Sequence, residues 1–113
     1  MKTESGLKKR EDFSRVYRKG KQRAGKLLVL YSLPNGTGIS RLGISVSKKV
    51  GNSVVRHRVT RLVREGYRHL EGNFKKGYDL VFVGRVSARD RACSDIEGAI
   101  YRLSSKTGLI KTE

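Results

Sequence analysis

Arginine and lysine side chains gather in one segment of the sequence, residues 48–68, which reads KKVGNSVVRHRVTRLVREGYR. Glu65 is the only acidic residue in this segment. Arginine is an informative choice, because its planar guanidinium group bonds phosphate oxygens bidentately and stacks on bases, which a lysine ammonium group does not. These residue types therefore predict binding of a polyanion. The basic residues of the segment are Lys48, Lys49, Arg56, Arg58, Arg61, Arg64 and Arg68.

The spacing in this segment predicts an amphipathic helix, capped by Asn52 or Ser53 and ending at about Leu70. His57 and the arginines at 58, 61, 64 and 68 fall on the side opposite the apolar stripe. A solvated charged face is the plainer interpretation, but such faces normally mix both signs of charge. We therefore favour a helix that packs along one side and binds a polyanion along the other. Its packing stripe is Val55, Val59, Leu62, Val63, Gly66 and Leu70.

The whole chain shares this basic character. Its 113 residues contain 26 Lys and Arg against 10 Asp and Glu, a formal net charge of +16 with a pI near 10.6. So much like charge opposes compaction, and we expect an anionic partner to neutralise it. Nucleic acid is the natural candidate, because each neutralised phosphate releases a condensed counterion. At 36% hydrophobic residues the chain can form one modest core, which predicts a single domain over 1–113.

Several other classes of protein are disfavoured. No apolar run approaches the ~20 residues that a membrane-spanning helix needs. The first residues, MKTESGLKKRED, lack the hydrophobic segment of a signal peptide, so we expect a cytoplasmic protein without a membrane partner. Cys93 has no second cysteine to pair with, which fits a reducing compartment.

The remaining pattern predicts an α+β domain with the order α-β-β-α-β-α. The two strands on either side of the PNGTG turn are expected to form an antiparallel hairpin. Ser94 and Glu97 are expected to form a capping box for the last helix. A short additional strand near 20–25 is compatible with the sequence. The predicted elements are a helix over 8–19, strands over 26–33, 41–47 and 78–84, the basic helix, and a last helix that Gly108 ends.

No protein active site is predicted. Phosphodiester cleavage by a protein needs paired histidines or a carboxylate cluster that holds metal ions. His57 and His69 are twelve residues apart on one predicted helix, about 18 Å along its axis. The acidic residues are scattered along the chain. We therefore assign no catalytic and no metal-ligating residue to the protein.

At this point the residues match a known family. Residues 45–65, SVSKKVGNSVVRHRVTRLVRE, resemble the signature of the protein subunit of bacterial ribonuclease P, which reads Lys-Lys-x-Gly-Asn-x-x-x-Arg-Asn-Arg. Two positions depart from that pattern, because His57 replaces the usual asparagine and Thr60 stands where a basic residue is common. Imidazole can hydrogen-bond and stack on a base, so we expect RNA binding to survive, with some pH dependence. The resemblance extends to DFSRVYRKGK at 12–21, LVLYSL at 28–33, RLGISVSKKVGN at 41–52 and YDLVFVGR at 78–85.

The resemblance implies a role in an endoribonuclease. In that family the catalytic RNA subunit, with bound magnesium, removes the 5′ leader from precursor tRNA. The protein subunit docks on the RNA, grips the leader and broadens the substrate range. The implied partners are the ribonuclease P catalytic RNA and precursor tRNA, with no obligate protein partner. The implied fold is a compact sandwich with a left-handed βαβ crossover, as in the ribosomal protein S5 domain 2-like fold, although the general rule favours a right-handed one.

The resemblance also implies two binding surfaces. Phe13, Tyr17 and Tyr31 match aromatics that line a leader-binding cleft in the family, although the spacing of Phe13 and Tyr17 alone favours core packing. The other aromatic residues, namely Phe74, Tyr78, Phe82 and Tyr101, are expected to pack. The residues expected to face the RNA subunit are Lys48, Lys49, Asn52, Arg56, His57, Arg58, Arg61, Arg64 and Arg68.

Two other classes remain open at this stage. The same charge and fold would serve a ribosomal or RNA-chaperone protein that has no catalytic partner. A DNA-binding module could place the arginine helix in a major groove, but it would be expected to dimerise, and no heptad or self-complementary surface is visible. The order of the motifs favours ribonuclease P. The sequence leaves open the preferred leader nucleotides, the effect of His57 and the oligomeric state without RNA.

Overall fold

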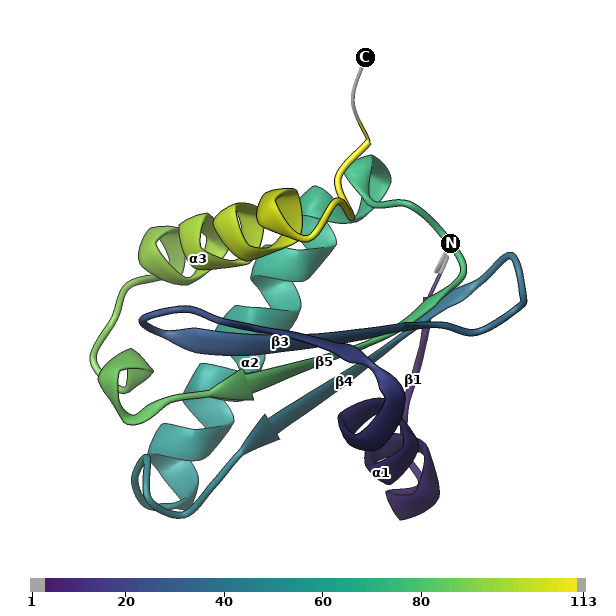
Figure 1. Ribbon diagram of the computed structural model, residues 1–113. Helices are drawn as coiled ribbons and strands as arrows, with labels where there is room; N and C mark the ends of the chain where they lie inside the picture. Colours follow the sequence, from purple (N-terminus) through teal and green to yellow (C-terminus); the bar gives the residue numbers. More distant parts are fainter. Residues whose placement is uncertain (1–3, 112–113) are drawn as a thin grey trace.

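The computed structural model describes residues 4–111 and contains one mixed sheet with helices on both faces (Figure 1). The predicted α+β class is confirmed, and so is the short additional strand, which is β2. A further strand at the start of the described residues, β1, was not predicted. In chain order the elements are β1 (Glu4–Gly6), α1 (Arg10–Lys19), β2 (Lys21–Ala24), β3 (Leu28–Pro34), β4 (Ser40–Val46), α2 (Ser53–Leu70), β5 (Tyr78–Gly84) and α3 (Cys93–Lys106).

The strand order is β1-β4-β5-β3-β2. β5 therefore lies between β3 and β4, antiparallel to the first and parallel to the second. The predicted hairpin of β3 with β4 is wrong. Leu80, Val81 and Phe82 of β5 are fully buried, and a strand that is apolar on both faces gains most from the centre of a sheet. β4, α2 and β5 thus form a βαβ unit, whose left hand stays a prediction.

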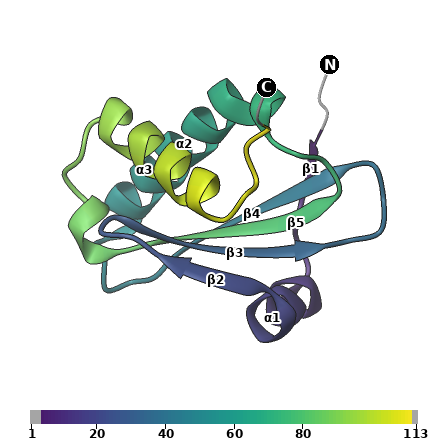
Figure 2. The ribbon, with the colours of Figure 1, turned by 45° about the horizontal axis from the view of Figure 1, so that its top comes forward.

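Two apolar clusters flank the sheet. On one face, α2 and α3 pack on the inward side chains of β3, β4 and β5, including Leu30, Leu42 and Phe82. The other face carries α1 (Figure 2). Val16 of this helix and Val81 of β5 belong to one buried cluster. Side chains alternate between the two faces along each strand, so neighbouring residues of one strand reach different helices. The sheet is therefore the common support of α1 on one side and of α2 and α3 on the other.

The basic helix, α2, begins and ends where its pattern predicts. Asn52 is the N-cap, and its side-chain oxygen accepts a hydrogen bond from the Val55 backbone N–H at 3.0 Å. The predicted stripe is buried or half-buried. Tyr67 is also buried, which was not predicted, and its ring centroid lies 4.9 Å from that of Phe74. The packing of α2 leaves its cationic side exposed.

The start of α3 differs from the prediction. Its N-cap is Ala92, whose backbone N–H donates to the Asp95 carboxylate at 3.1 Å. The predicted capping box of Ser94 and Glu97 is wrong, because the sequence holds an acid at the third helical position of an earlier start. Glu97 instead lies 2.8 Å from Nδ1 of His69 on α2. Tyr101, expected to pack, is 49% exposed because it lies on the outer side of α3.

Candidate RNA-binding surfaces

The outer side of α2 forms an open cationic groove of about 750 Å³. Arg61, Arg64 and Arg68 are exposed, and among the described residues only Arg61 of these three forms an ion pair, with Glu65 at 3.5 Å. That pair is exposed at both ends and contributes little to stability. Lys48 and Lys49 are also exposed, in the turn before the helix. The groove is lined by Val54, His57, Arg58, Thr60, Arg61 and Arg64.

Two arginines of this segment bind the protein's own backbone. Arg58 donates from Nη1 to the Arg89 carbonyl at 3.1 Å and from Nη2 to the Arg91 carbonyl at 2.7 Å. Arg56 donates from Nε to the Gly51 carbonyl at 3.2 Å. Arg58 therefore ties the loop after β5 to α2. This loop carries two further exposed arginines, Arg89 and Arg91. Nothing in the local pattern of α2 indicates this contact.

The three aromatic residues assigned to the leader lie together on the α1 face of the sheet. The ring centroids of Tyr17 and Tyr31 are 4.9 Å apart, and those of Phe13 and Tyr17 are 6.3 Å apart. Tyr17 is 39% exposed, whereas Phe13 and Tyr31 are half-buried. We name Phe13, Tyr17 and Tyr31 the aromatic cluster. Its contacts are compatible with core packing and with leader binding, because the cluster packs on the sheet and Tyr17 is still exposed to solvent.

The place of Phe13 depends on a glycine beneath it. A Cβ atom at Gly43 of β4 would lie 2.7 Å from Cζ of the Phe13 ring, closer than two carbon atoms can approach. Glycine at this position therefore lets the ring rest on the strand itself. On the other side of the cluster, Gln22 of β2 donates to the Tyr31 hydroxyl at 3.2 Å. The cluster is thus positioned by α1, β2, β3 and β4 together.

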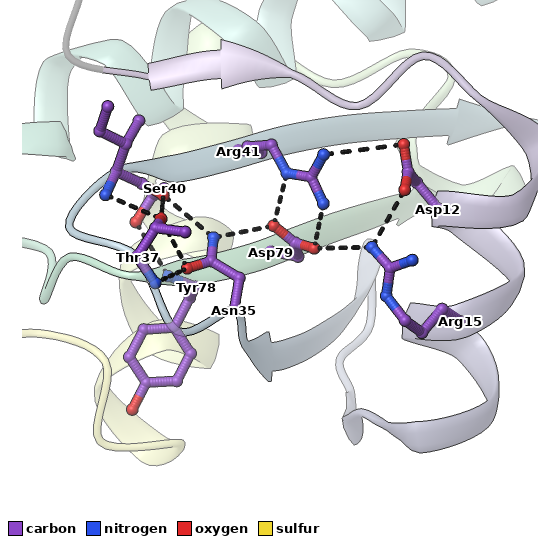
Figure 3. A network of polar contacts seen from close by, with 9 residues as sticks. Asp12, Arg15, Asn35, Thr37, Ser40, Arg41, Tyr78 and Asp79 are labelled. Carbon is purple, nitrogen blue, oxygen red and sulfur yellow. Dashed lines mark hydrogen bonds and ion pairs between the residues drawn. The ribbon is translucent and has the colours of Figure 1, made fainter.

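A buried ion-pair network fixes α1 on the sheet, and sequence reasoning missed it (Figure 3). Asp79 of β5 has a side chain only 1% exposed. Arg41 of β4 donates to both its oxygens, from Nε at 2.9 Å and from Nη2 at 2.7 Å. Arg15 of α1 donates to Asp79 at 3.3 Å and to Asp12 at 3.0 Å, and Asn35 donates to Asp79 at 3.0 Å. These bonds join residues far apart in the sequence, so no local motif announces them.

The network perturbs two titrations. Burial alone would raise the pKa of Asp79, but the hydrogen bonds from Arg41, Asn35 and Arg15 outweigh it and hold the pKa below its usual value. The pKa of Arg41 is raised, chiefly by its hydrogen bond to Asp79. Asp79 is therefore a carboxylate at neutral pH, and its charge anchors the two arginines.

Residues 4–111 contain no group of three His, Cys, Asp or Glu side chains that could hold a metal ion. Among the same residues, no helix is long and apolar enough to cross a membrane.

The protein is thus a small α+β domain with a cationic helix on one side of a mixed sheet and an aromatic cluster on the other. The family model for ribonuclease P matches residues 1–108, and the chain belongs to that family. The ribonuclease P protein component of Clostridium botulinum strain Langeland is 52% identical over 107 residues, 94% of this chain and 96% of that protein. The component of Alkaliphilus oremlandii is 47% identical over 112 residues, covering 99% and 98%.

Solved structures agree with this assignment. The RNase P protein of Staphylococcus aureus matches with a TM-score of 0.86 at 29% identity, covering 98% of this chain and all of that one. The RNase P protein of Thermotoga maritima matches with a TM-score of 0.83 at 28% identity, covering 90% and 96%. The predicted family is confirmed, and none of these comparisons favours a ribosomal or RNA-chaperone protein.

Proposed function

We propose that this protein assists an RNA-catalysed endonuclease by holding two RNA segments on opposite faces of its sheet. The RNA subunit of ribonuclease P binds the α2 face and, with magnesium ions bound mainly by RNA, performs the cleavage. The 5′ leader of precursor tRNA binds the α1 face, and the complex works in the cytoplasm. The observation that carries the proposal is the separation of the two surfaces. Exposed arginines lie along α2, whereas the aromatic cluster lies across the sheet from that helix.

The α2 face suits a folded RNA. Arginine guanidinium groups bind phosphate oxygens bidentately, and each contact releases a counterion from the RNA. Val54, 75% exposed at the start of α2, adds an apolar surface against which a sugar or base can pack. Arg61, Arg64 and Arg68 are the strongest candidates for direct contact, because Arg56 and Arg58 already donate to backbone carbonyls. Asn52 also has a structural role, because its side chain caps the N-terminus of α2.

The aromatic cluster suits an unpaired strand. Bases of a single strand stack on aromatic rings whatever their identity, which matches a leader that differs between precursors. Tyr17 has the largest exposed fraction of the three and is the best candidate for the stacking ring. Phe13, on the same helix, and Tyr31, on β3, pack against its ring.

The test is cleavage of a precursor tRNA by a bacterial ribonuclease P RNA at low magnesium concentration, with and without this protein. The protein should restore cleavage. Arg61→Gln with Arg64→Gln should weaken its affinity for the RNA by at least about tenfold, because two guanidinium groups no longer bind phosphates. Lys75→Gln with Lys76→Gln removes the same charge from an exposed loop and should leave the affinity nearly unchanged. RNA binding without restored cleavage would instead support a ribosomal or RNA-chaperone role.

A second variant tests the leader surface. Tyr17→Ala should lower the affinity of the assembled complex for precursor tRNA by about tenfold, the effect of removing one stacking ring, and leave its affinity for mature tRNA unchanged. Tyr101→Ala is the matched control, because Tyr101 is an exposed helical tyrosine on the other face. Equal losses for precursor and mature tRNA would refute leader binding at the aromatic cluster.

A further inference from the structure

A second cationic site lies at the β2 edge of the sheet, away from both surfaces described above. It is a small pocket of about 180 Å³ between the turn that joins β2 to β3 and one side of α3. Leu27, Ala99 and Leu103 are buried beneath it, and four exposed cations surround these apolar side chains. We call it the edge pocket, and its cations are Arg23, Lys26, Arg102 and Lys106.

Among the residues that the structure describes, no acidic side chain forms an ion pair with a cation of the edge pocket. The sequence has no acid between Asp12 and Glu65, and the acids of α3, Asp95 and Glu97, lie in its first half. A favourable position at the helix C-terminus accounts for Lys106, but not for Arg23 and Lys26, which come from a different segment. Gathering four like charges opposes folding unless an anion binds between them.

The edge pocket is rigidly built. Arg85 donates from Nη1 to the Gly25 carbonyl at 3.0 Å, and its backbone N–H donates to the Leu27 carbonyl at 3.0 Å. Ser87 donates from its hydroxyl to the Lys26 carbonyl. These bonds tie the turn to the end of β5, so the wall that carries Lys26 is preformed. A preformed wall binds an anion without first losing conformational freedom.

The edge pocket also faces away from α2. Gly66 of α2 packs against Glu97 and Ile100 of α3, so that side of α3 is covered. The pocket uses the other flank of α3, through Arg102 and Lys106. The ribbon shows α3 above the β3 and β2 side of the sheet (Figure 2). An RNA docked on the cationic groove of α2 therefore leaves the edge pocket open to another RNA segment.

The size and position of the edge pocket identify the ligand. Its volume is below the roughly 300 Å³ at which pockets for small-molecule ligands begin, but it can accept a phosphate group. Arg23 is the next residue along β2 after Gln22, whose side chain donates to Tyr31 of the aromatic cluster. Successive residues of a β-strand are about 3.3 Å apart along the strand, and their side chains point to opposite faces of the sheet. An RNA segment that leaves Tyr31 and passes over the β2 edge therefore meets Arg23 next.

We propose that the edge pocket binds a backbone phosphate of the 5′ leader, beyond the nucleotides that stack on the aromatic cluster. The proposal rests on the proposed function, because it takes the aromatic cluster as the leader surface. It extends the leader path from the α1 face, around the β2 edge, to α3. The contact is to phosphate and is therefore independent of leader sequence.

The test compares Arg23→Gln with Lys26→Gln, and Arg102→Gln with Lys106→Gln, in the complex with ribonuclease P RNA. The probes are two precursor tRNAs, one with a long leader and one whose leader ends at the aromatic cluster. Each double variant should weaken binding of the long-leader precursor by about two- to fivefold. The slope of log affinity against log salt should fall by about 0.7 for each phosphate that the protein no longer neutralises. Binding of the short-leader precursor should not change.

Lys75→Gln with Lys76→Gln removes the same charge elsewhere and serves as the control. Losses no larger than those of this control would show that the edge pocket is a solvated cationic surface and would overturn the proposal. Equal losses for the two precursors, or weaker binding to the RNA subunit alone, would assign the phosphate to the RNA subunit and overturn the leader path. Failure of the proposed function is separate, because the wild-type protein would then not restore cleavage at all.

Discussion

Asp79→Asn is the substitution that most directly tests the ion-pair network beneath the proposed leader surface. It keeps the side-chain shape but removes the charge that receives two hydrogen bonds from Arg41, at 2.9 and 2.7 Å. Breaking a buried ion pair at one partner costs about 3–5 kcal/mol. The Arg41 side chain is 32% exposed, so water can solvate it once the carboxylate is gone, and the lower end of that range applies. We therefore expect the free energy of unfolding to fall by about 3 kcal/mol.

The measurement is urea unfolding followed by circular dichroism, with Asp90→Asn as the control. Asp90 is exposed and pairs with no cation within residues 4–111, so its variant makes the same change of charge without breaking an ion pair. A loss of about 3 kcal/mol corresponds to a decrease in melting temperature of about 12–24 °C. If the two variants unfold within about 0.5 kcal/mol of each other, the network does not stabilise the fold and the reasoning fails.

The same network predicts how stability depends on pH. The pKa of Asp79 is lower in the folded protein than in the unfolded chain, where the pKa of an aspartate is about 3.9. Its contribution is therefore fully present above that value and is lost as the pH falls through the folded pKa. Urea midpoints should fall steeply below about pH 4 in the wild type and less steeply in Asp79→Asn. Parallel curves for the two proteins would contradict the assigned pKa shift.

Two further substitutions test individual contacts. Arg58→Lys keeps the charge but loses the fork that donates to two carbonyls, so unfolding measurements should show a loss of about 1–2 kcal/mol, whereas Arg61→Lys should cost less than about 0.5 kcal/mol. Equal costs would show that the Arg58 hydrogen bonds do not stabilise the loop. Gly43→Ala should displace the Phe13 ring and weaken binding of precursor tRNA, measured by filter binding, without affecting assembly on the RNA subunit. Gly38→Ala is the control, because a Cβ there has open space around it, and it should change neither precursor binding nor assembly.

Local patterns determine how much of this structure could be predicted. The bounds of α2 and β5 follow from periodicity and capping, because those signals lie within each segment. The place of β5 between β3 and β4 could not be predicted the same way, because adjacency in the sequence favours a hairpin and only the burial of both faces of β5 decides against it. The apolar character of residues 80–83 was the available signal.

The candidate site divides along the same line. The cationic side of α2 is visible in the sequence because its residues share one helix. The hydrogen bonds of Arg58 could not be predicted from the sequence, because the two acceptor carbonyls lie 31 and 33 residues further along the chain. The aromatic cluster was identified by resemblance rather than by physics, since spacing alone places Phe13 and Tyr17 in the core. Neither local patterns nor the family resemblance predicted the Asp79 network, because its members come from α1, β4, β5 and the turn between β3 and β4.

The two proposed RNA-binding surfaces are connected through one strand. In β4, Gly43 lies beneath Phe13 on the α1 face, while its neighbours Leu42 and Ile44 pack in the cluster under α2. Because adjacent residues of a strand point to opposite faces, a shift of β4 would move both surfaces at once. Arg41, on the same strand, forms an ion pair with Asp79 that helps to keep β4 in register with β5. Asp79 also pairs with Arg15, which holds α1 on the sheet. In the proposed complex the sheet would therefore fix the distance between an RNA docked on α2 and a leader held by α1. That rigid spacing is what a protein needs if it is to present a substrate strand to a catalytic site that lies in its RNA partner.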